Sequence, residues 1–202
     1  MIFFKNFYIL FKSINIFGFI RLLIDLFITK LFYPNARILR RPFFIRNEGS
    51  FSFEKGLSTG PGLIIEVFGK NAKIQIGKNM IASNNLHIGA SESVIIGNNV
   101  LIAGSVYISD HNHGSYSGEF QSSPLESPVD RELTSLPVKI GNNVWIGERV
   151  SILPGVSIGQ GVVIGAGSVV TRSLPDFVIA AGAPAKIIKQ YDLEKKIWRS
   201  EK

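Results

Sequence analysis

Two histidines separated by a single residue are the clearest chemical feature of this 202-residue sequence. His111 and His113 are two of only three histidines, and Asp110 directly precedes them. Because imidazole is neutral near pH 7, either side chain can take a proton from a hydroxyl group, and a neighbouring carboxylate can orient the ring. The pattern therefore favours a site that activates a hydroxyl, although two solvated loop histidines would give the same spacing.

The composition excludes several other kinds of chemistry. The sequence contains no cysteine, which excludes a disulfide framework, a thiolate metal site and an acyl group carried on a thiol. Hydrophobic residues make up 46% of the chain and charged residues 18%, which excludes a wholly disordered protein. The absence of cysteine is also compatible with a cytoplasmic location.

A six-residue repeat fills the middle of the sequence and must position these histidines. Between residues 140 and 175 every sixth residue is Ile or Val, and a second aliphatic residue follows most of them four positions later. An α-helix needs a spacing near 3.6 residues and a simple strand needs two, so a period of six predicts a coil of short strands with three faces. Together with runs at 76–93 and 96–113, the repeat predicts about four turns, with part of another from residue 64.

Residues 109–137 interrupt this repeat with a long polar segment. Both histidines lie at its beginning, and regular hexapeptides resume after it at residue 140. A polar insertion of this length in a compact coil is usually functional or disordered. The coil forces the insertion outward, so we expect an arm that reaches over a neighbouring subunit.

Residues 1–33 are apolar and basic at the same time. Charged residues such as Lys12, Arg21 and Lys30 interrupt every run that could reach the about 20 apolar residues of a transmembrane helix, and no secretory cleavage site is present. We expect one or two helices, ended by Pro34, that lie in a membrane interface or pack on another subunit; a helical cap on the coil is the remaining alternative. Basic residues mixed with Phe and Ile suit an anionic membrane better than nucleic acid in this chain of net charge +7.

Three motifs within residues 108–189 resemble the maltose and galactoside O-acetyltransferases of the hexapeptide-repeat acyltransferase family. They are Val144-Trp145-Ile146-Gly147, Ile164-Gly165-Ala166-Gly167-Ser168-Val169-Val170-Thr171 and Ala181-Gly182-Ala183-Pro184-Ala185-Lys186. The whole chain, including Ile108-Ser109-Asp110-His111-Asn112-His113-Gly114, is similar to bacterial O-acetyltransferases of lipopolysaccharide O-antigen and capsule synthesis. The resemblance implies a left-handed parallel β-helix, a homotrimer with active sites between subunits, and acetyl-CoA as donor.

The expected fold is therefore all-β. An apolar, basic helical segment and linker occupy residues 1–48, and a left-handed parallel β-helix occupies residues 49–185, from which the long loop of residues 109–137 projects as an arm. A short C-terminal helix is expected in residues 186–202.

The resemblance also implies which residues act in catalysis. His113 lies five residues after the inward-facing Ile108, which is the offset of the catalytic histidine in the related acetyltransferases, so it is the first candidate for the general base. His111 is the alternative base, or a residue that positions the acceptor. Trp145 is expected to line the cleft beside the histidine and the acetyl group, or else to pack against a neighbouring arm.

Donor and acceptor contacts follow from the same resemblance. Small and cationic residues suit the pantetheine arm and the phosphates of acetyl-CoA, and the matching positions are Ala166, Thr171, Lys186 and Lys189. Ordinary turn residues and solvated lysines would be the alternative interpretation. Asn84 and Asn85 are candidates for contact with an acceptor sugar, although asparagines also close the corners of such coils. No metal is expected.

These observations predict an enzyme that transfers acetyl from acetyl-CoA to a sugar hydroxyl of a bacterial surface glycan, either free or linked to its lipid carrier. We expect it in the cytoplasm, peripherally bound at the inner face of the cell membrane. A zinc-dependent hydratase like the γ-type carbonic anhydrases is one alternative, but only Asn112 separates the paired histidines here, where that family has four residues. A non-catalytic β-helical scaffold is the other, and it leaves His113, Trp145 and the arm unexplained.

Overall fold

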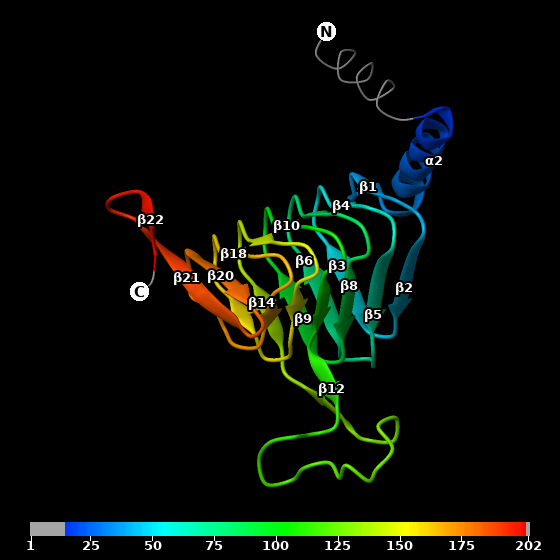
Figure 1. Ribbon diagram of the computed structural model, residues 1–202. Helices are drawn as coiled ribbons and strands as arrows, with labels where there is room; N and C mark the ends of the chain where they lie inside the picture. The colour runs from blue at the N-terminus through cyan, green and yellow to red at the C-terminus, as the bar shows by residue number, and fades with distance from the viewer. Residues whose placement is uncertain (1–14, 201–202) are drawn as a thin grey trace.

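The computed structural model describes residues 15–200, which form a three-faced solenoid with a helix at one end and a hairpin at the other (Figure 1). Each face is one sheet of stacked parallel strands, and the nine-stranded sheet ends in two antiparallel strands, β21 (Ala185–Asp192) and β22 (Ile197–Ser200). The nine-stranded face contains β1 (Ile38–Leu39), β4 (Ser58–Thr59), β7 (Ile81–Ala82), β10 (Leu101–Ile102), β15 (Trp145–Ile146), β18 (Val163–Ile164), β20 (Val178–Gly182), β21 and β22. The six-stranded face contains β2 (Phe43–Asn47), β5 (Leu63–Val67), β8 (His87–Ala90), β11 (Tyr107–Ser109), β16 (Ser151–Ile152) and β19 (Val169–Val170). The five-stranded face contains β3 (Ser50–Phe53), β6 (Lys73–Ile76), β9 (Ser93–Ile96), β14 (Val138–Ile140) and β17 (Ser157–Ile158).

The core of the solenoid is the column of aliphatic side chains that the hexapeptide repeat predicted. Ile146, Ile152 and Ile158 are buried on three successive strands, one from each face of the solenoid. Strands of one face pair in register, so that Ile102, Ile146 and Ile164 stack directly above one another. Each inward residue therefore contacts its equivalents in the turns on both sides, which confirms the predicted coil of short strands.

The solenoid begins earlier than the sequence predicted. Parallel pairing starts at Ile38 rather than at residue 49, and seven strands from β1 to β20 follow one another on the nine-stranded face instead of about four or five turns. The sequence does not reveal the early turns because their length differs from three hexapeptides. One turn takes eighteen residues from Ile146 to Ile164, but twenty from Leu39 to Thr59. Their strands are also longer, so alternation with a period of two determines which side chains are buried.

Strand β5 shows the consequence of this longer strand. Leu63, Ile65 and Val67 point into the core, while Ile64 and Glu66 lie on the outer side. The register that begins at Ile64 in the sequence is therefore wrong by one residue, and a one-residue slip exchanges the two faces of a strand. As a result Glu66 belongs to the outer surface of the six-stranded face.

Helix α2 (Ile16–Phe32) closes the first turn of the solenoid. Its N-cap residue Asn15 accepts a hydrogen bond from the Gly18 amide at 2.8 Å, and the helix ends before Pro34, as the sequence predicted. Residues 1–14 of the predicted helical segment lie outside the described part of the chain. Among the helices of residues 15–200, none has both the length and the apolar character needed to cross a membrane.

The amphipathicity of α2 is reversed relative to that of a usual surface helix. The side that faces the solenoid carries Asp25 and Thr29, which are both 1% exposed. Asp25 accepts a hydrogen bond from Arg41 at 2.6 Å, and the Leu39 amide donates to the Thr29 hydroxyl at 2.9 Å. The solvent side carries most of the large apolar side chains, namely Ile16, Phe17, Ile20, Leu23, Ile24, Phe27, Leu31 and Phe32. Polar contacts therefore hold the helix to the solenoid and leave an apolar face without cover.

Between β11 and β14 the chain leaves the solenoid. Strands β12 (His111–His113) and β13 (Leu133–Ser135) pair antiparallel, and residues 114–132 connect them in the segment that projects from the solenoid in Figure 1. Within this segment Arg131 donates to the Tyr116 hydroxyl at 2.7 Å, and Thr134 donates to the Gly114 carbonyl at 2.8 Å. Asp110, His111 and His113 thus follow directly after β11, the last strand of the solenoid before this segment.

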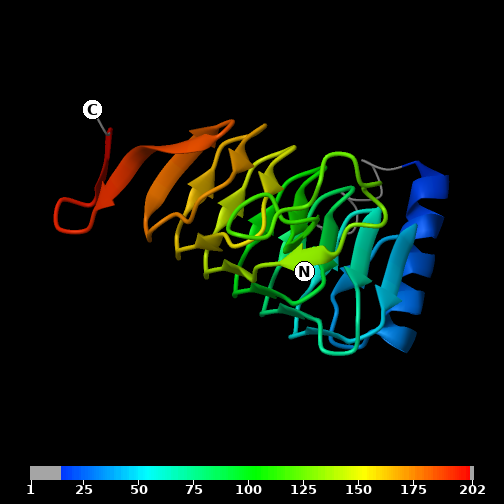
Figure 2. The same ribbon diagram turned by 90° about the horizontal axis from the view of Figure 1, so that it is seen from below.

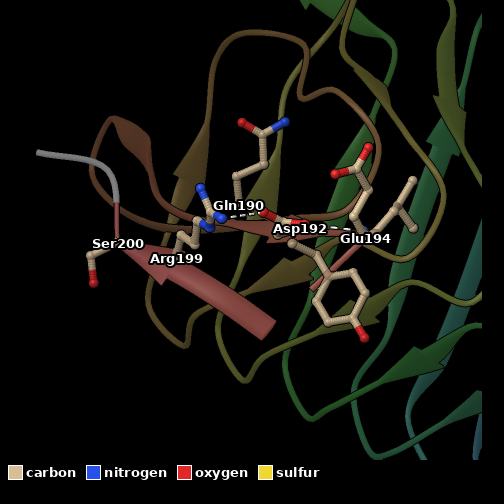
Figure 3. A pocket seen from close by; sticks show the side chains of 7 residues that line it. Gln190, Asp192, Glu194, Arg199 and Ser200 are labelled. Carbon is tan, nitrogen blue, oxygen red and sulfur yellow. Dashed lines mark hydrogen bonds and ion pairs between the residues drawn. The ribbon is translucent and has the colours of Figure 1, made fainter. Parts of the chain in front are cut away.

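The predicted C-terminal helix in residues 186–202 is wrong. Strands β21 and β22 form an antiparallel extension of the nine-stranded face beyond the last turn, as Figure 2 shows from below. The charged residues of this segment favour a helix by local propensity. Pairing of β21 with β20 instead satisfies the backbone hydrogen bonds of β21 along most of its length. Asp192 and Arg199 form an ion pair at 2.5 Å across the hairpin, and both line a pocket together with Gln190, Glu194 and Ser200 (Figure 3).

Candidate active site

Asp110 and His111 form a carboxylate–imidazole pair at the corner where the chain leaves the six-stranded face. The Asp110 carboxylate is fully buried, and its Oδ1 lies 3.0 Å from His111 Nδ1. The His111 side chain is 13% exposed and packs edge-on against Phe68, with ring centroids 5.3 Å apart. A Cβ atom at Gly89 would lie 3.1 Å from His111 Cε1, so this glycine leaves space for the ring.

Backbone amides of the neighbouring turn fix the carboxylate. The amides of Ser91, Glu92 and Ser93 donate to Asp110 at 2.8, 2.8 and 2.6 Å. Burial raises the pKa of Asp110, but the hydrogen bond with His111 and those three amides outweigh it and hold the pKa below its ordinary value. Asp110 is therefore ionised at neutral pH and can orient the His111 ring through Nδ1.

His113 has a different environment. It is exposed at the end of β12, on the edge of the segment that projects from the solenoid. Its carbonyl accepts a hydrogen bond from the Tyr116 hydroxyl at 2.5 Å, and its ring has no hydrogen-bond partner within residues 15–200. Both ring nitrogens are thus available to a group outside this part of the chain.

Trp145 does not lie beside the histidines in a single chain. It is 52% exposed on the outer side of β15, in the nine-stranded face, whereas the histidines follow β11 of the six-stranded face. Ile81, Leu101 and Trp145 are directly opposite one another on neighbouring strands and form an exposed apolar row. One chain therefore presents the two predicted parts of the catalytic centre on different surfaces.

The residues expected to bind acetyl-CoA lie around the last turns. Ala166 is exposed at the corner between β18 and β19, and Thr171 is exposed just after β19. Lys186 and Lys189 lie on β21 rather than on a helix, and both are exposed. Lys186 is opposite Ala181, which approaches the turn that contains Ala166 at Gly165. The structure therefore brings Ala166 near Lys186, while Thr171 lies at the opposite end of β19.

Asn84 and Asn85 lie at the corner between β7 and β8. Asn85 adopts a left-handed conformation with φ of 57°, and its amide donates to the Pro61 carbonyl at 2.9 Å. The Asn84 carbonyl accepts from the Ser105 amide at 2.8 Å. Both residues thus help to close a corner of the solenoid, which is the role that asparagines often have in turns, and both side chains are exposed there.

A second histidine–carboxylate pair, which the sequence does not predict, lies on the same face. His87 Nε2 lies 2.9 Å from Glu66 Oε2, and its ring packs edge-on against Tyr107 with centroids 5.2 Å apart. His87 and Gly89 are two residues apart on β8, so they lie on the same side of the strand. Because the His111 ring covers Gly89, the Glu66–His87 pair is next to that ring. The outward position of Glu66 depends on the register of β5, which the irregular early repeat does not reveal.

Within residues 15–200, no three histidine, cysteine or acidic residues come close enough together to hold a metal ion.

Comparisons with known proteins agree with this architecture. Residues 137–172 match the family model described as bacterial transferase hexapeptide (six repeats). WbbJ of Escherichia coli K12, described as a candidate O-acetyl transferase of lipopolysaccharide biosynthesis, is 47% identical over 188 residues, which cover 93% of this chain and 95% of that protein. Thus the similarity extends over the solenoid and both of its ends.

Two solved structures share the fold together with moderate sequence identity. Galactoside acetyltransferase in complex with coenzyme A superposes with a TM-score of 0.53 at 36% identity, covering 76% of this chain and 67% of that one. The hexapeptide-repeat acetyltransferase VCA0836 of Vibrio cholerae, complexed with acetyl-CoA, gives a TM-score of 0.52 at 27% identity, covering 73% and 70%. On the strength of the repeat, the shared fold and the nearly full-length relative, this chain belongs to the hexapeptide-repeat O-acetyltransferases, in the galactoside and maltose acetyltransferase branch.

Proposed function

We propose that this enzyme transfers the acetyl group of acetyl-CoA to a sugar hydroxyl of a lipopolysaccharide O-antigen or capsule precursor. The description of WbbJ supports the glycan, and the coenzyme A and acetyl-CoA complexes of two relatives support the donor. The observation that carries the proposal is the Asp110–His111–His113 corner, where the solenoid opens into a polar segment. The other histidine–carboxylate pair, Glu66–His87, lies on the outer side of two strands within the solenoid and not where the chain leaves it.

His113 is the proposed general base. Its ring is exposed and both nitrogens are without a partner in the described chain, so one of them can approach an acceptor hydroxyl. The hydroxyl proton passes to His113 while the acceptor oxygen forms a bond to the acetyl carbonyl carbon. Backbone amides stabilise the oxyanion, the carbon–sulfur bond breaks, and the proton moves from His113 to the departing thiolate.

His111 is the second candidate for the base, and a specific observation favours it. The buried Asp110 carboxylate lies 3.0 Å from Nδ1, which leaves Nε2 as the reactive nitrogen, as in a carboxylate–histidine dyad. Against this role, Phe68 and Gly89 enclose the ring, which is only 13% exposed. We therefore assign His111 to holding the corner and positioning the acceptor.

The proposed active form is a homotrimer in which the site lies between subunits. Trp145 and the histidines are on different faces of one chain, so a single catalytic centre requires the nine-stranded face of one subunit to meet the histidine corner of the next. In this arrangement the exposed row of Ile81, Leu101 and Trp145 lines the cleft between the two subunits. Acetyl-CoA then lies along the last turns, with Ala166 and Thr171 beside its pantetheine arm and Lys186 and Lys189 near its phosphates.

The proposed location is the inner surface of the cell membrane. The apolar face of α2 includes Phe17 and Phe27, which are 80% and 70% exposed. The helix carries Arg21 and Lys30 beside this face, and its acidic residue Asp25 is buried and paired with Arg41. An apolar helix face bordered by cations suits an anionic bilayer surface.

Calorimetric titration of the purified, metal-stripped protein with acetyl-CoA tests the proposed function. We expect saturable binding near one site per chain. Absence of binding at millimolar acetyl-CoA would contradict the transferase proposal, and the bound zinc content would then decide whether a hydratase is the better assignment.

A further inference from the structure

A groove of about 490 Å³ runs along the outside of the nine-stranded face, from the helix end of the solenoid to Trp145. Ile81, Leu101 and Trp145 form one side of it, and the small residues Gly60 and Ser83 leave the neighbouring corner open. Its far end is Trp145, which the proposed trimer brings into the catalytic centre. The groove therefore connects the helix end of the molecule with the catalytic centre.

Arg40 lies at the helix end of this groove and supplies an unpaired cation there. Arg40 lines the groove, is partly buried, and its side chain has no hydrogen bond or ion pair within residues 15–200. Its neighbour Arg41 is already bound to Asp25, and Arg21 donates to the Arg41 carbonyl. A guanidinium that is partly desolvated and unpaired is well suited to bind a phosphate through two parallel hydrogen bonds.

The same end of the groove adjoins the reversed helix. Helix α2 packs against β1, and Ile38 of β1 lines the groove together with Arg40. Helix α2 thus lies at the same end of the solenoid as this part of the groove, so a lipid chain joined to the ligand would remain in a bilayer that the apolar face of the helix contacts.

The length of the groove indicates the size of its ligand. Trp145 is on β15, four strands away from β1 on the nine-stranded face, and strands in a sheet are about 4.8 Å apart, which gives roughly 19 Å. This length exceeds that of a single sugar ring and suits an extended oligosaccharide. Aliphatic and aromatic side chains along it can pack against the apolar faces of sugar rings.

We propose that this groove binds an oligosaccharide joined through a phosphate to a membrane lipid. The phosphate pairs with Arg40, the sugars extend along Ile81 and Leu101, and the acetylated hydroxyl lies at Trp145. The inference rests on the proposed function and makes it more specific: the acceptor is a lipid-linked oligosaccharide rather than a free sugar or a nucleotide sugar.

Binding to vesicles of phosphatidylcholine that contain a polyprenyl diphosphate tests the proposal. The variants are Arg40→Gln and its matched control Arg37→Gln, which removes the same charge from a separate pocket at the same end of the solenoid. At physiological ionic strength we expect Arg40→Gln to weaken binding about tenfold more than Arg37→Gln does. On vesicles with phosphatidylglycerol in place of the diphosphate, the two variants should weaken binding equally.

Equal losses for the two variants on diphosphate vesicles would overturn the proposal, because only general surface charge would then be involved. The same extra loss for Arg40→Gln on phosphatidylglycerol vesicles would also overturn it. Both variants should keep the wild-type melting temperature and acetyl-CoA affinity, since Arg40 is distant from the last turns. Failure of the wild-type protein to bind acetyl-CoA would refute the proposed function, whereas equal variants with normal acetyl-CoA binding would refute this inference alone.

Discussion

The late turns of the solenoid and its early turns differ in regularity and in chemistry. From β14 to β19 the strands are two or three residues long and each buries an Ile or Val at its end. From β1 to β8 the strands vary in length, and their outer surface carries Glu66, His87 and Arg40. The break after β11 carries Asp110, His111 and His113. The difference indicates that the regular late turns supply stability and the proposed surface for acetyl-CoA, whereas the proposed general base lies where the period of six is lost.

Replacement of His113 by Ala should reduce activity more than any other variant described below. It changes only the break in the repeat after β11. Loss of the proposed base should lower acetyl transfer by about 10²- to 10⁴-fold, while acetyl-CoA binding and the melting temperature remain those of the wild type. Turnover and calorimetric titration measure the two properties separately. His111→Ala serves as the comparison: a full loss of turnover in His111→Ala, with normal turnover in His113→Ala, would assign the base to His111.

A substitution that leaves a cavity in the regular turns should lower stability and leave turnover unchanged, which is the opposite of the effect expected for His113→Ala. Ile152 is fully buried between Ile108 and Val170 on the strands above and below it. Ile152→Ala should lower the free energy of unfolding by about 2–5 kcal/mol through lost burial and an unfilled cavity. Chemical denaturation measures this loss, and turnover of the folded variant should stay near that of the wild type. A strong loss of turnover without destabilisation would break the division between the two regions.

Asp110→Asn changes the corner where the regular turns meet the break after β11, so it should affect both stability and turnover. Asn cannot accept all three amide hydrogen bonds that Asp110 accepts, so we expect a loss of about 2–3 kcal/mol at neutral pH. The folded-state pKa of Asp110 lies below its ordinary value, so the wild-type carboxylate contributes stability above about pH 4 and loses it as the pH falls through that lowered pKa. Unfolding of both proteins across this pH range should therefore converge on acidification. A constant difference at all pH values would contradict the ionised carboxylate.

Phe27→Ser is the smallest expected change and tests the membrane face of α2. Removing a phenylalanine that is 70% exposed leaves the contacts of Asp25 and Thr29 with the solenoid intact. Binding to anionic vesicles should weaken about tenfold, because partial insertion of one aromatic side chain contributes about 1.5 kcal/mol, the lower end of the range for full burial. Phe120→Ser, in the segment between β12 and β13, is the matched control and should bind normally. Equal behaviour of the two variants would remove α2 from the membrane contact.

The sequence predicts the regular part of this molecule because each hexapeptide repeats the same local choice of side chains. Ile140 to Val170 could be placed correctly from spacing alone. The C-terminal hairpin could not, because β21 is determined by pairing with β20 across a turn and not by its own charged residues. The Glu66–His87 pair was equally inaccessible, since it joins strands whose register depends on an irregular connection. The orientation of the His111 ring by Asp110 was foreseen, but the three amides that fix the carboxylate belong to a preceding turn.

Complementation between two inactive variants tests directly whether the catalytic site lies between subunits. If the site combines His113 of one subunit with Trp145 of the next, then mixing His113→Ala and Trp145→Ala chains, followed by unfolding and joint refolding, restores some intact sites. Random assortment in trimers predicts recovery of about a quarter of the wild-type turnover per chain. If mixed trimers form, as mass measurement of tagged chains can establish, and turnover does not recover, the site lies within one chain and not between subunits.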